Sequence, residues 1–176
     1  MSFLEVPIKA GACDPSTQEL YARGHIVVWT KPGEHAPQRL QDLTDPRYEH
    51  VAIANPQTAP YGKAALEALK SAGIYDQVKP KLVFGNNVQQ TLQFAQTGNA
   101  DAAIVALSLA KVTNGSTLPI DESLHQPIDQ ALIVCKHGQN PAAAKEFASF
   151  LKSDTGHAIM KKYGFLLPGE KISMNE

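Results

Sequence analysis

Short apolar segments rich in Val and Ile alternate along this chain with segments whose apolar residues recur at helical spacing. Five segments are short and apolar enough to be buried strands, namely HIVVW (25–29), HVAIA (50–54), KLVFG (81–85), AAIVAL (102–107) and ALIVCK (131–136). Between them, residues 61–72 and 88–96 each carry apolar residues along one helical face. This alternation predicts an α/β fold with a mixed, mainly parallel sheet.

The remaining segments carry weaker signals. The first 24 residues contain hardly any strong element, and the Pro-rich segment at 31–50 reads as a polar surface connection with at most one short helix at Gln38 to Leu43. After the last strand, NPAAAKEFASFLKS and DTGHAIMKKYGFLLP predict two consecutive helices. The second of them should end near Gly164, because glycine is the usual residue just past a helix end.

The composition excludes several classes of partner. Of the 176 residues, 43% are hydrophobic and 19% charged, which is typical of a globular protein with a sizeable core. Sixteen basic residues nearly balance seventeen acidic ones, and no block of like charge suggests a nucleic acid or a membrane surface as a partner. No apolar run approaches the roughly 18 to 20 residues of a membrane span, and the first residues lack the pattern of a signal peptide.

Signatures of catalysis and of metal binding are also missing. The six histidines show no HxxxH or HExxH spacing, and no pair of cysteines has the spacing of zinc ligands. The chain contains no GxSxG, GxGxxG or GxxxxGK[ST] motif. We therefore expect a protein that is not an enzyme and that has neither a cofactor nor a metal cation site.

The two cysteines do not identify a cellular compartment. Cys135 lies inside the apolar run ALIVCK and is expected to be a small buried hydrophobic residue, whereas Cys13 lies in a loop rich in Gly, Asp and Pro. A disulfide between them is the less favoured alternative, because the sequence cannot place their Cα atoms within the required few Å.

The segment ANPQTAPYGK has features suited to binding an anion. The strand ends at Ala54, and Pro60 falls at the first helical position, where proline is best tolerated. The backbone amides of Tyr61, Gly62 and Lys63 would then lack partners at the positive end of the helix, beside the carboxyl end of a strand where ligands bind in open α/β sheets. The alternative is a plain strand-to-helix turn whose amides are bound by water.

The segment KLVFGNNVQQTLQF repeats this arrangement. Gly85, Asn86 and Asn87 follow a strand, and a helix opens at Val88 with its first amides again unpaired. Two helix starts after neighbouring strands could converge on one small anion. Downstream, the strand that ends at Ala106 to Ser108 either lines the same edge or is simply a connection.

Together these segments resemble a known family. The segments that carry the resemblance, from about Lys9 to Pro168, are YARGHIVVW, DPRYEHVAIANPQTAPYGKAALEAL, KPKLVFGNNVQQTLQFAQTGNADAAIVALS, QPIDQALIVCK and KKYGFLLP. They are similar to the periplasmic molybdate/tungstate-binding proteins of ABC transporters, which have a type II periplasmic binding-protein fold. Each segment alone is weak, but the set is specific.

The resemblance implies a ligand and a set of donors. In this family two lobes close around a tetrahedral oxyanion, which receives only neutral hydrogen bonds from amides and hydroxyls. Carried over by motif, one amide donor falls on Tyr61, with Ala59 and Gly62 nearby, and another falls on Val88, with Asn87 nearby. Ala106 stands where some members have a tyrosine, so one hydroxyl donor is missing.

The resemblance also implies a biological setting. It implies molybdate or tungstate as the ligand, with sulfate less favoured. A site of donors alone favours these dianions over a phosphate that still carries a proton. It further implies a membrane permease as the partner and the periplasm as the location. The alternatives are a ligand-sensing regulatory domain of the same fold, which the absence of a helix-turn-helix segment disfavours, and a fragment that does not bind.

One departure from the family concerns the organisation of the chain. The strand and serine-bearing loop with which family members begin have no match here. We therefore expect residues 1–24 to be a remnant of an N-terminal lobe, 25–135 to be a complete ligand-binding lobe, and 136–176 to be helices of the first, incomplete lobe. Missing donors would make molybdate binding weak or absent.

The helices at 141–163 would then need a substitute partner. Their expected apolar face comprises Phe147, Phe150, Leu151 and Ile159. A large exposed apolar patch favours association. We expect this face to pack on the lobe that is present, or to form a homodimer or swapped assembly.

Overall fold

The computed structural model describes residues 2–136 and 138–170, and the chain divides into two compact units. One unit is His25–Ile128, and the other combines Met1–Gly24 with Asp129–Glu176. The His25–Ile128 unit begins at the same residue as the ligand-binding lobe predicted at 25–135, but it ends at Ile128 and not at residue 135. The difference arises because the strand that follows pairs with a strand of the other unit.

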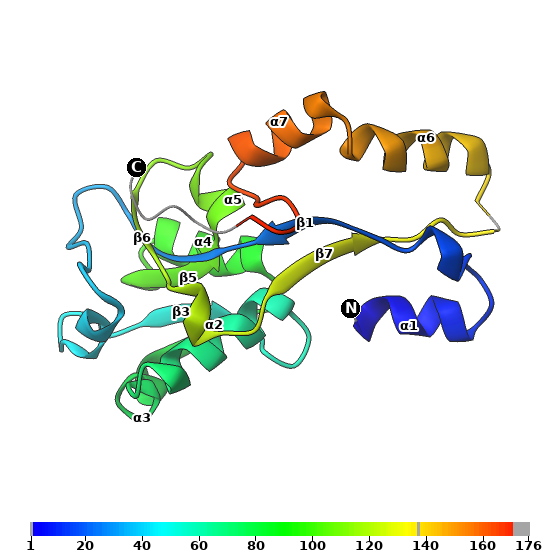
Figure 1. Ribbon diagram of the computed structural model, residues 1–176. Helices are drawn as coiled ribbons and strands as arrows, with labels where there is room; N and C mark the ends of the chain where they lie inside the picture. Colours follow the sequence, from blue (N-terminus) through cyan, green and yellow to red (C-terminus); the bar gives the residue numbers. More distant parts are fainter. Residues whose placement is uncertain (1, 137, 171–176) are drawn as a thin grey trace. The chain divides into compact units, whose positions relative to one another are not determined.

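A five-stranded sheet forms the centre of the His25–Ile128 unit (Figure 1). Its strands are β2 (Ile26–Thr30), β3 (Val51–Ala54), β4 (Leu82–Gly85), β5 (Ala102–Ala106) and β6 (Ser116–Pro119), in the order β4-β3-β5-β2-β6. β3 pairs in parallel with β4 and β5, whereas β2 pairs antiparallel with β5 and β6. The expected mixed sheet is confirmed. Parallel pairings do not outnumber antiparallel ones, because β6, a mostly exposed strand that was not predicted from the sequence, adds a second antiparallel pairing.

Helices cover both faces of this sheet. The elements are α2 (Pro60–Ser71), α3 (Tyr75–Val78), α4 (Val88–Gln96) and α5 (Leu107–Ala110), with 3₁₀ turns η2 (Leu40–Thr44), η3 (Lys79–Lys81) and η4 (Glu122–Leu124). Ile26 and Val28 pack in a core with α2, while Val27 and Trp29 pack in a second core with α4. This alternation follows from the two-residue period of a strand. The helices expected at 61–72 and 88–96 are confirmed, and the short helix expected at 38–43 is the 3₁₀ turn η2.

The other unit is built from both ends of the chain. Its elements are α1 (Ser2–Lys9), η1 (Pro15–Thr17), β1 (Glu19–Gly24), β7 (Ile128–Leu132), α6 (Pro141–Leu151) and α7 (Asp154–Lys162). β1 and β7 form a two-stranded sheet. The expectation of hardly any element before residue 25 is wrong, and the strand expected at 131–136 instead begins at Ile128 and ends at Leu132. The expected helix end near Gly164 is confirmed by its φ of 78°.

Polar contacts join β1 to the C-terminal half of this unit. The guanidinium Nε of Arg23 lies 2.7 Å from a carboxylate oxygen of Asp129, and both side chains are more than two-thirds buried. The backbone of Arg23 also exchanges two hydrogen bonds with Leu166, at 2.8 and 3.0 Å. Lys152 pairs with Glu19 at 2.9 Å. Segments from the two ends of the sequence therefore hold each other in place.

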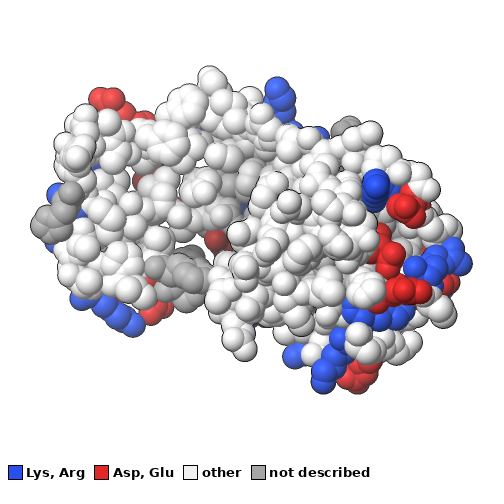
Figure 2. Space-filling view, turned by 180° about the vertical axis from the view of Figure 1, so that it is seen from behind, with Lys and Arg blue, Asp and Glu red and all other residues white. Residues whose placement is uncertain are grey.

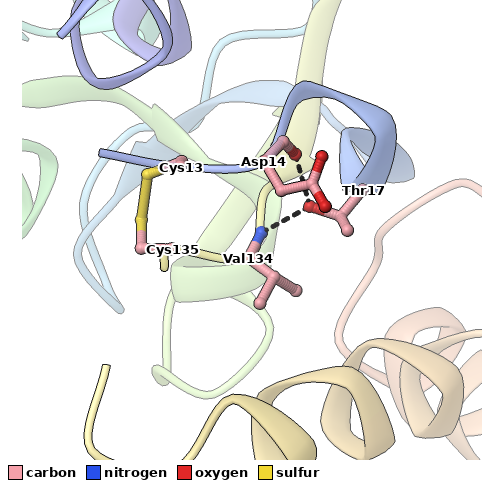
Figure 3. The surroundings of a disulfide bond; sticks show 5 residues. All are labelled: Cys13, Asp14, Thr17, Val134 and Cys135. Atoms are coloured by element: carbon pink, nitrogen blue, oxygen red, sulfur yellow. Dashed lines mark hydrogen bonds between the residues drawn. A yellow bond between two sulfur atoms is a disulfide. The ribbon is translucent and has the colours of Figure 1, made fainter. Parts of the chain in front are cut away.

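A disulfide between Cys13 and Cys135 adds a covalent link to this unit (Figure 3). Backbone hydrogen bonds flank it, from Asp14 N to Val134 O and from Lys136 N to Ala12 O, both at 2.9 Å. The expectation that Cys135 is a buried, unpaired residue is therefore wrong. Cys135 lies beyond the end of β7, where its side chain is exposed, and it faces the nearly fully buried Cys13 across an isolated antiparallel bridge.

The expected apolar face on α6 and α7 is partly confirmed. Phe147, Phe150 and Ile159 are 60%, 43% and 42% exposed, and the two phenylalanine rings stack with centroids 6.5 Å apart. Leu151, which was expected in the same face, is buried instead. Within residues 2–136 and 138–170, no helix is long and apolar enough to cross a membrane.

The disulfide should stabilise one unit and leave the other unchanged. It closes a loop with a sequence separation of 122 residues, and removing a native disulfide typically costs about 2–5 kcal/mol. We expect Cys135→Ser to raise amide hydrogen exchange in residues 10–24 and 129–136, measured by mass spectrometry, without changing exchange in residues 30–120.

A reductant provides the control for this experiment. It should reproduce the effect in the wild-type chain and add nothing in the Cys135→Ser variant. Equal increases of exchange in both units would contradict the expectation, because they would show that the disulfide acts on the whole chain.

Candidate functional site

Three strands of the central sheet end at the same edge. Ala54 at the end of β3 lies opposite Gly85 at the end of β4, and Ile53 lies opposite Ile104 of β5 in a parallel register. The turns that follow β3 and β4 are joined directly, because Asn55 N donates a hydrogen bond of 2.8 Å to Gly85 O. The starts of α2, α4 and α5 therefore lie at one edge, with α2 and α4 on opposite faces of the sheet (Figure 1).

The structure thus brings all the sequence-predicted site residues to this edge. Ala59, Tyr61 and Gly62 lie at the start of α2, and Asn87 and Val88 lie at the start of α4. Ala106 is the last residue of β5 and precedes the first residue of α5. Carboxyl-end edges of this kind are where ligands bind in α/β sheets.

Asn55 organises the turn between β3 and α2. Its side-chain oxygen accepts a hydrogen bond from Gln57 N at 3.0 Å, and its carbonyl accepts from Thr58 N at 3.2 Å and Ala59 N at 2.9 Å. Ala59 is extended, with φ of −120° and ψ of 120°, and Pro60 begins the helix. The local sequence therefore sets the direction in which α2 leaves the sheet.

Gly62 allows the first turn of α2 to lie directly on the end of β3. A Cβ atom built at Gly62 would overlap the carbonyl oxygen of Ala54. The expectation for the amide of Lys63 is wrong, because this amide donates to Ala59 O at 3.0 Å and closes the first turn of the helix. The amide of Gly62 has no protein acceptor within the part of the chain that the structure describes.

The start of α4 is fixed by reciprocal capping. The side chain of Asn87 accepts from Gln90 N at 2.9 Å, and the side chain of Gln90 accepts from Asn86 N at 2.7 Å. Thr91 donates to Asn87 O from both its amide and its hydroxyl, at 3.1 and 2.8 Å. Gln90 is not among the site residues predicted from the sequence, although the pattern Asn-x-x-Gln before an apolar helix is a recognised capping signal.

Capping leaves a run of amides open at α4. Among residues 2–136 and 138–170, no acceptor lies within hydrogen-bond range of the amides of Asn87, Val88 and Gln89. These three consecutive donors lie at the positive end of the helix dipole. Such a run of unpaired backbone donors at a helix start is chemically suited to an anion.

The other candidate groups contribute less. Ala106 is 3% exposed and has no hydroxyl to donate, while Ser108 lies in the first turn of α5. The ammonium of Lys63 is mostly exposed and lies 3.9 Å from a carboxylate oxygen of Glu67 along the same helix. The described residues include no group of three or more His, Cys, Asp or Glu that could hold a metal ion.

Gly62→Ala tests the close contact between α2 and β3. The added methyl group cannot fit against the Ala54 carbonyl without moving the helix, and overpacking of this kind typically costs about 1–3 kcal/mol. We expect chemical denaturation to show that loss of unfolding free energy. Ser71→Ala, at an exposed position of the same helix, should change the unfolding free energy by less than about 0.5 kcal/mol. Equal losses in the two variants would contradict the close contact between Gly62 and Ala54.

Comparison with known proteins identifies the family. Residues 1–166 match the family model described as bacterial extracellular solute-binding protein. The chain is 37% identical over 163 residues to the molybdate-binding protein ModA of Rhodobacter capsulatus, covering 90% of this chain and 63% of that relative. It is 35% identical over 162 residues to ModA of Azotobacter vinelandii, covering 89% of this chain and 64% of the relative.

A solved structure agrees with these matches. The periplasmic molybdate-binding protein of Azotobacter vinelandii superposes with a TM-score of 0.83 at 33% identity, covering 94% of this chain and 74% of that structure. The likeness confirms the expected periplasmic binding-protein fold. The chain spans less than two thirds of the length of the curated relatives described above. On the match over residues 1–166, the chain belongs to the family of bacterial extracellular solute-binding proteins.

Proposed function

We propose that this chain is the solute-binding component, or part of one, that binds molybdate or tungstate for uptake by an ABC transporter. The observation that carries the proposal is the run of open amides at Asn87, Val88 and Gln89, at the sheet edge where α2 also starts. The two relatives described above are named as molybdate-binding proteins, which supports this choice of ligand.

The donor set explains which anions the site would accept. A fully ionised tetrahedral dianion only accepts hydrogen bonds, so amides alone can satisfy it. A phosphate that still carries a proton needs an acceptor as well, and the backbone amides provide none. Val88 and Tyr61 are the proposed donors, with Ala59, Gly62 and Asn87 shaping the helix starts. Sulfate, also a dianion, is the less favoured alternative.

The proposed role includes a setting. As a solute-binding protein, the chain would act by binding without catalysis or a cofactor, and would deliver its oxyanion to a membrane permease. We place it in the periplasm. The disulfide between Cys13 and Cys135 supports that location, because such bonds persist in oxidising compartments.

Val88→Pro removes one proposed donor with little change to the helix. Val88 is the first residue of α4, where proline is tolerated, and Asn87 is extended, with φ of −153° and ψ of 172°, as a residue before proline must be. A hydrogen bond to a charged ligand contributes about 1.5–3 kcal/mol. We therefore expect molybdate affinity to fall by roughly 10- to 150-fold, measured by amide NMR titration or calorimetry.

Val88→Ala is the matched control, since it trims the side chain and keeps the amide. It should bind molybdate as the wild type does, and phosphate should bind to neither chain at comparable concentration. Unchanged affinity in Val88→Pro would exclude this amide as a donor. Wild-type binding is expected to be weak, because some of the family's donors have no match in this sequence. A spectrum that responds to neither molybdate nor tungstate would contradict the proposed function itself.

We also propose that two copies associate through residues 141–163. Phe147, Phe150 and Ile159 expose apolar surface on α6 and α7, which supports this proposal. We expect sedimentation analysis to show a dimer that the double variant Phe147→Ser, Phe150→Ser converts to a monomer. Val6→Ser changes an exposed apolar residue of α1 and should leave the dimer intact. A monomeric wild-type chain would overturn the proposal.

A further inference from the structure

A hollow lies within the His25–Ile128 unit, in the polar segment at 31–50. It is a cavity of about 440 Å³ whose wall includes Arg39, Asp42, Asp45 and Arg47. The light-blue segment at the left of Figure 1 lies on the right of Figure 2, which shows the molecule from behind. Basic and acidic side chains are densely mixed there. None of these residues belongs to the candidate oxyanion site, so the cavity needs its own explanation.

The frame of this cavity is firmly anchored. Tyr48 lines the cavity and is 2% exposed, and its hydroxyl donates to the carbonyl of His35 at 2.9 Å. The ammonium of Lys81 donates to three consecutive backbone carbonyls at the end of η2, at distances of 2.7 to 3.2 Å. The charged side chains therefore project from a fixed backbone.

The two carboxylates of the wall are already occupied. Asp42 accepts hydrogen bonds from Gln38 N at 2.9 Å, from Arg39 N at 3.2 Å and from Arg39 Nε at 3.0 Å. Asp45 accepts from Arg47 N at 2.9 Å and lies 3.0 Å from Arg47 Nε. Hydrogen bonds from the two arginine side chains lower the pKa of Asp42 and of Asp45, so both carboxylates stay ionised and paired.

The two guanidinium groups, in contrast, keep most of their donors. Arg39 and Arg47 each contact their carboxylate through Nε. Within the described part of the chain, the terminal Nη groups of both arginines donate to no protein acceptor. The unused hydrogen-bonding capacity of the arginines is therefore donor capacity, arranged in planar forks that match carboxylate and phosphate oxygens.

We propose that this cavity is a second binding site, for a small organic anion whose carboxylate or phosphate group is held by the Nη groups of Arg39 and Arg47. The volume of about 440 Å³ lies in the range of small-molecule sites. The formal charges of the two arginines and two aspartates cancel, so recognition depends on directional hydrogen bonds and should be weak, with millimolar dissociation constants. This site is independent of the proposed molybdate site.

An amide NMR titration of the full chain tests the proposal. The probes are sodium malate and glycerol 3-phosphate, with sodium chloride at matched ionic strength as the blank. We expect saturable shifts confined to residues 35–48. A response to malate alone identifies a carboxylate site, and a response to glycerol 3-phosphate alone identifies a phosphate site.

Paired variants provide the control. Arg39→Gln with Arg47→Gln should weaken the response by about tenfold or more. Lys31→Gln with Lys111→Gln removes the same charge from exposed lysines outside the cavity wall and should leave it unchanged. Shifts that match the chloride blank, or that persist in the arginine pair in an otherwise native spectrum, would overturn the proposal. Molybdate shifts at residues 87–89 report on the other site separately.

Discussion

The contact on which the candidate site most depends is that between the first turn of α2 and the last carbonyl of β3. Only a hydrogen atom fits at Gly62, because any side chain would overlap the oxygen of Ala54. Asn55 N bonds Gly85 O in the neighbouring turn, so the same strand end also positions the start of α4. Two helix starts are thereby held at one sheet edge, and a modest movement of either would misplace the amides that the proposed function requires.

The two polar regions of the His25–Ile128 unit differ in the groups they leave unused. At the start of α4, the side chains of Asn87 and Gln90 accept hydrogen bonds from Gln90 N and Asn86 N. The backbone amides of Asn87, Val88 and Gln89 stay open. Around the cavity, the carboxylates of Asp42 and Asp45 are engaged by the Nε atoms of Arg39 and Arg47, and the Nη groups of these arginines donate to no acceptor in the described part of the chain. Neutral, fixed amides suit a desolvated inorganic dianion, whereas exposed guanidinium groups suit a larger and more weakly held anion.

The other unit depends on contacts between residues far apart in the sequence. β1 and β7 make only a two-stranded sheet, which is marginally stable by itself. The ion pair between Arg23 and Asp129 and the disulfide between Cys13 and Cys135 therefore contribute much of what joins the two chain ends. The exposed rings of Phe147 and Phe150 in the same unit are apolar surface that these links do not cover.

The sequence by itself determined the strands of the central sheet from β2 to β5, the helices α2 and α4, and the position of Pro60 at a helix start. These depend on local periodicity and on the fixed φ of proline, which act over a few residues. Tertiary structure alone decided the pairing of β1 with β7, the position of β6, the disulfide and the reason for a glycine at position 62. Each of these requires segments distant in sequence to meet in space, and a periodicity of two or 3.6 residues carries no record of such a meeting.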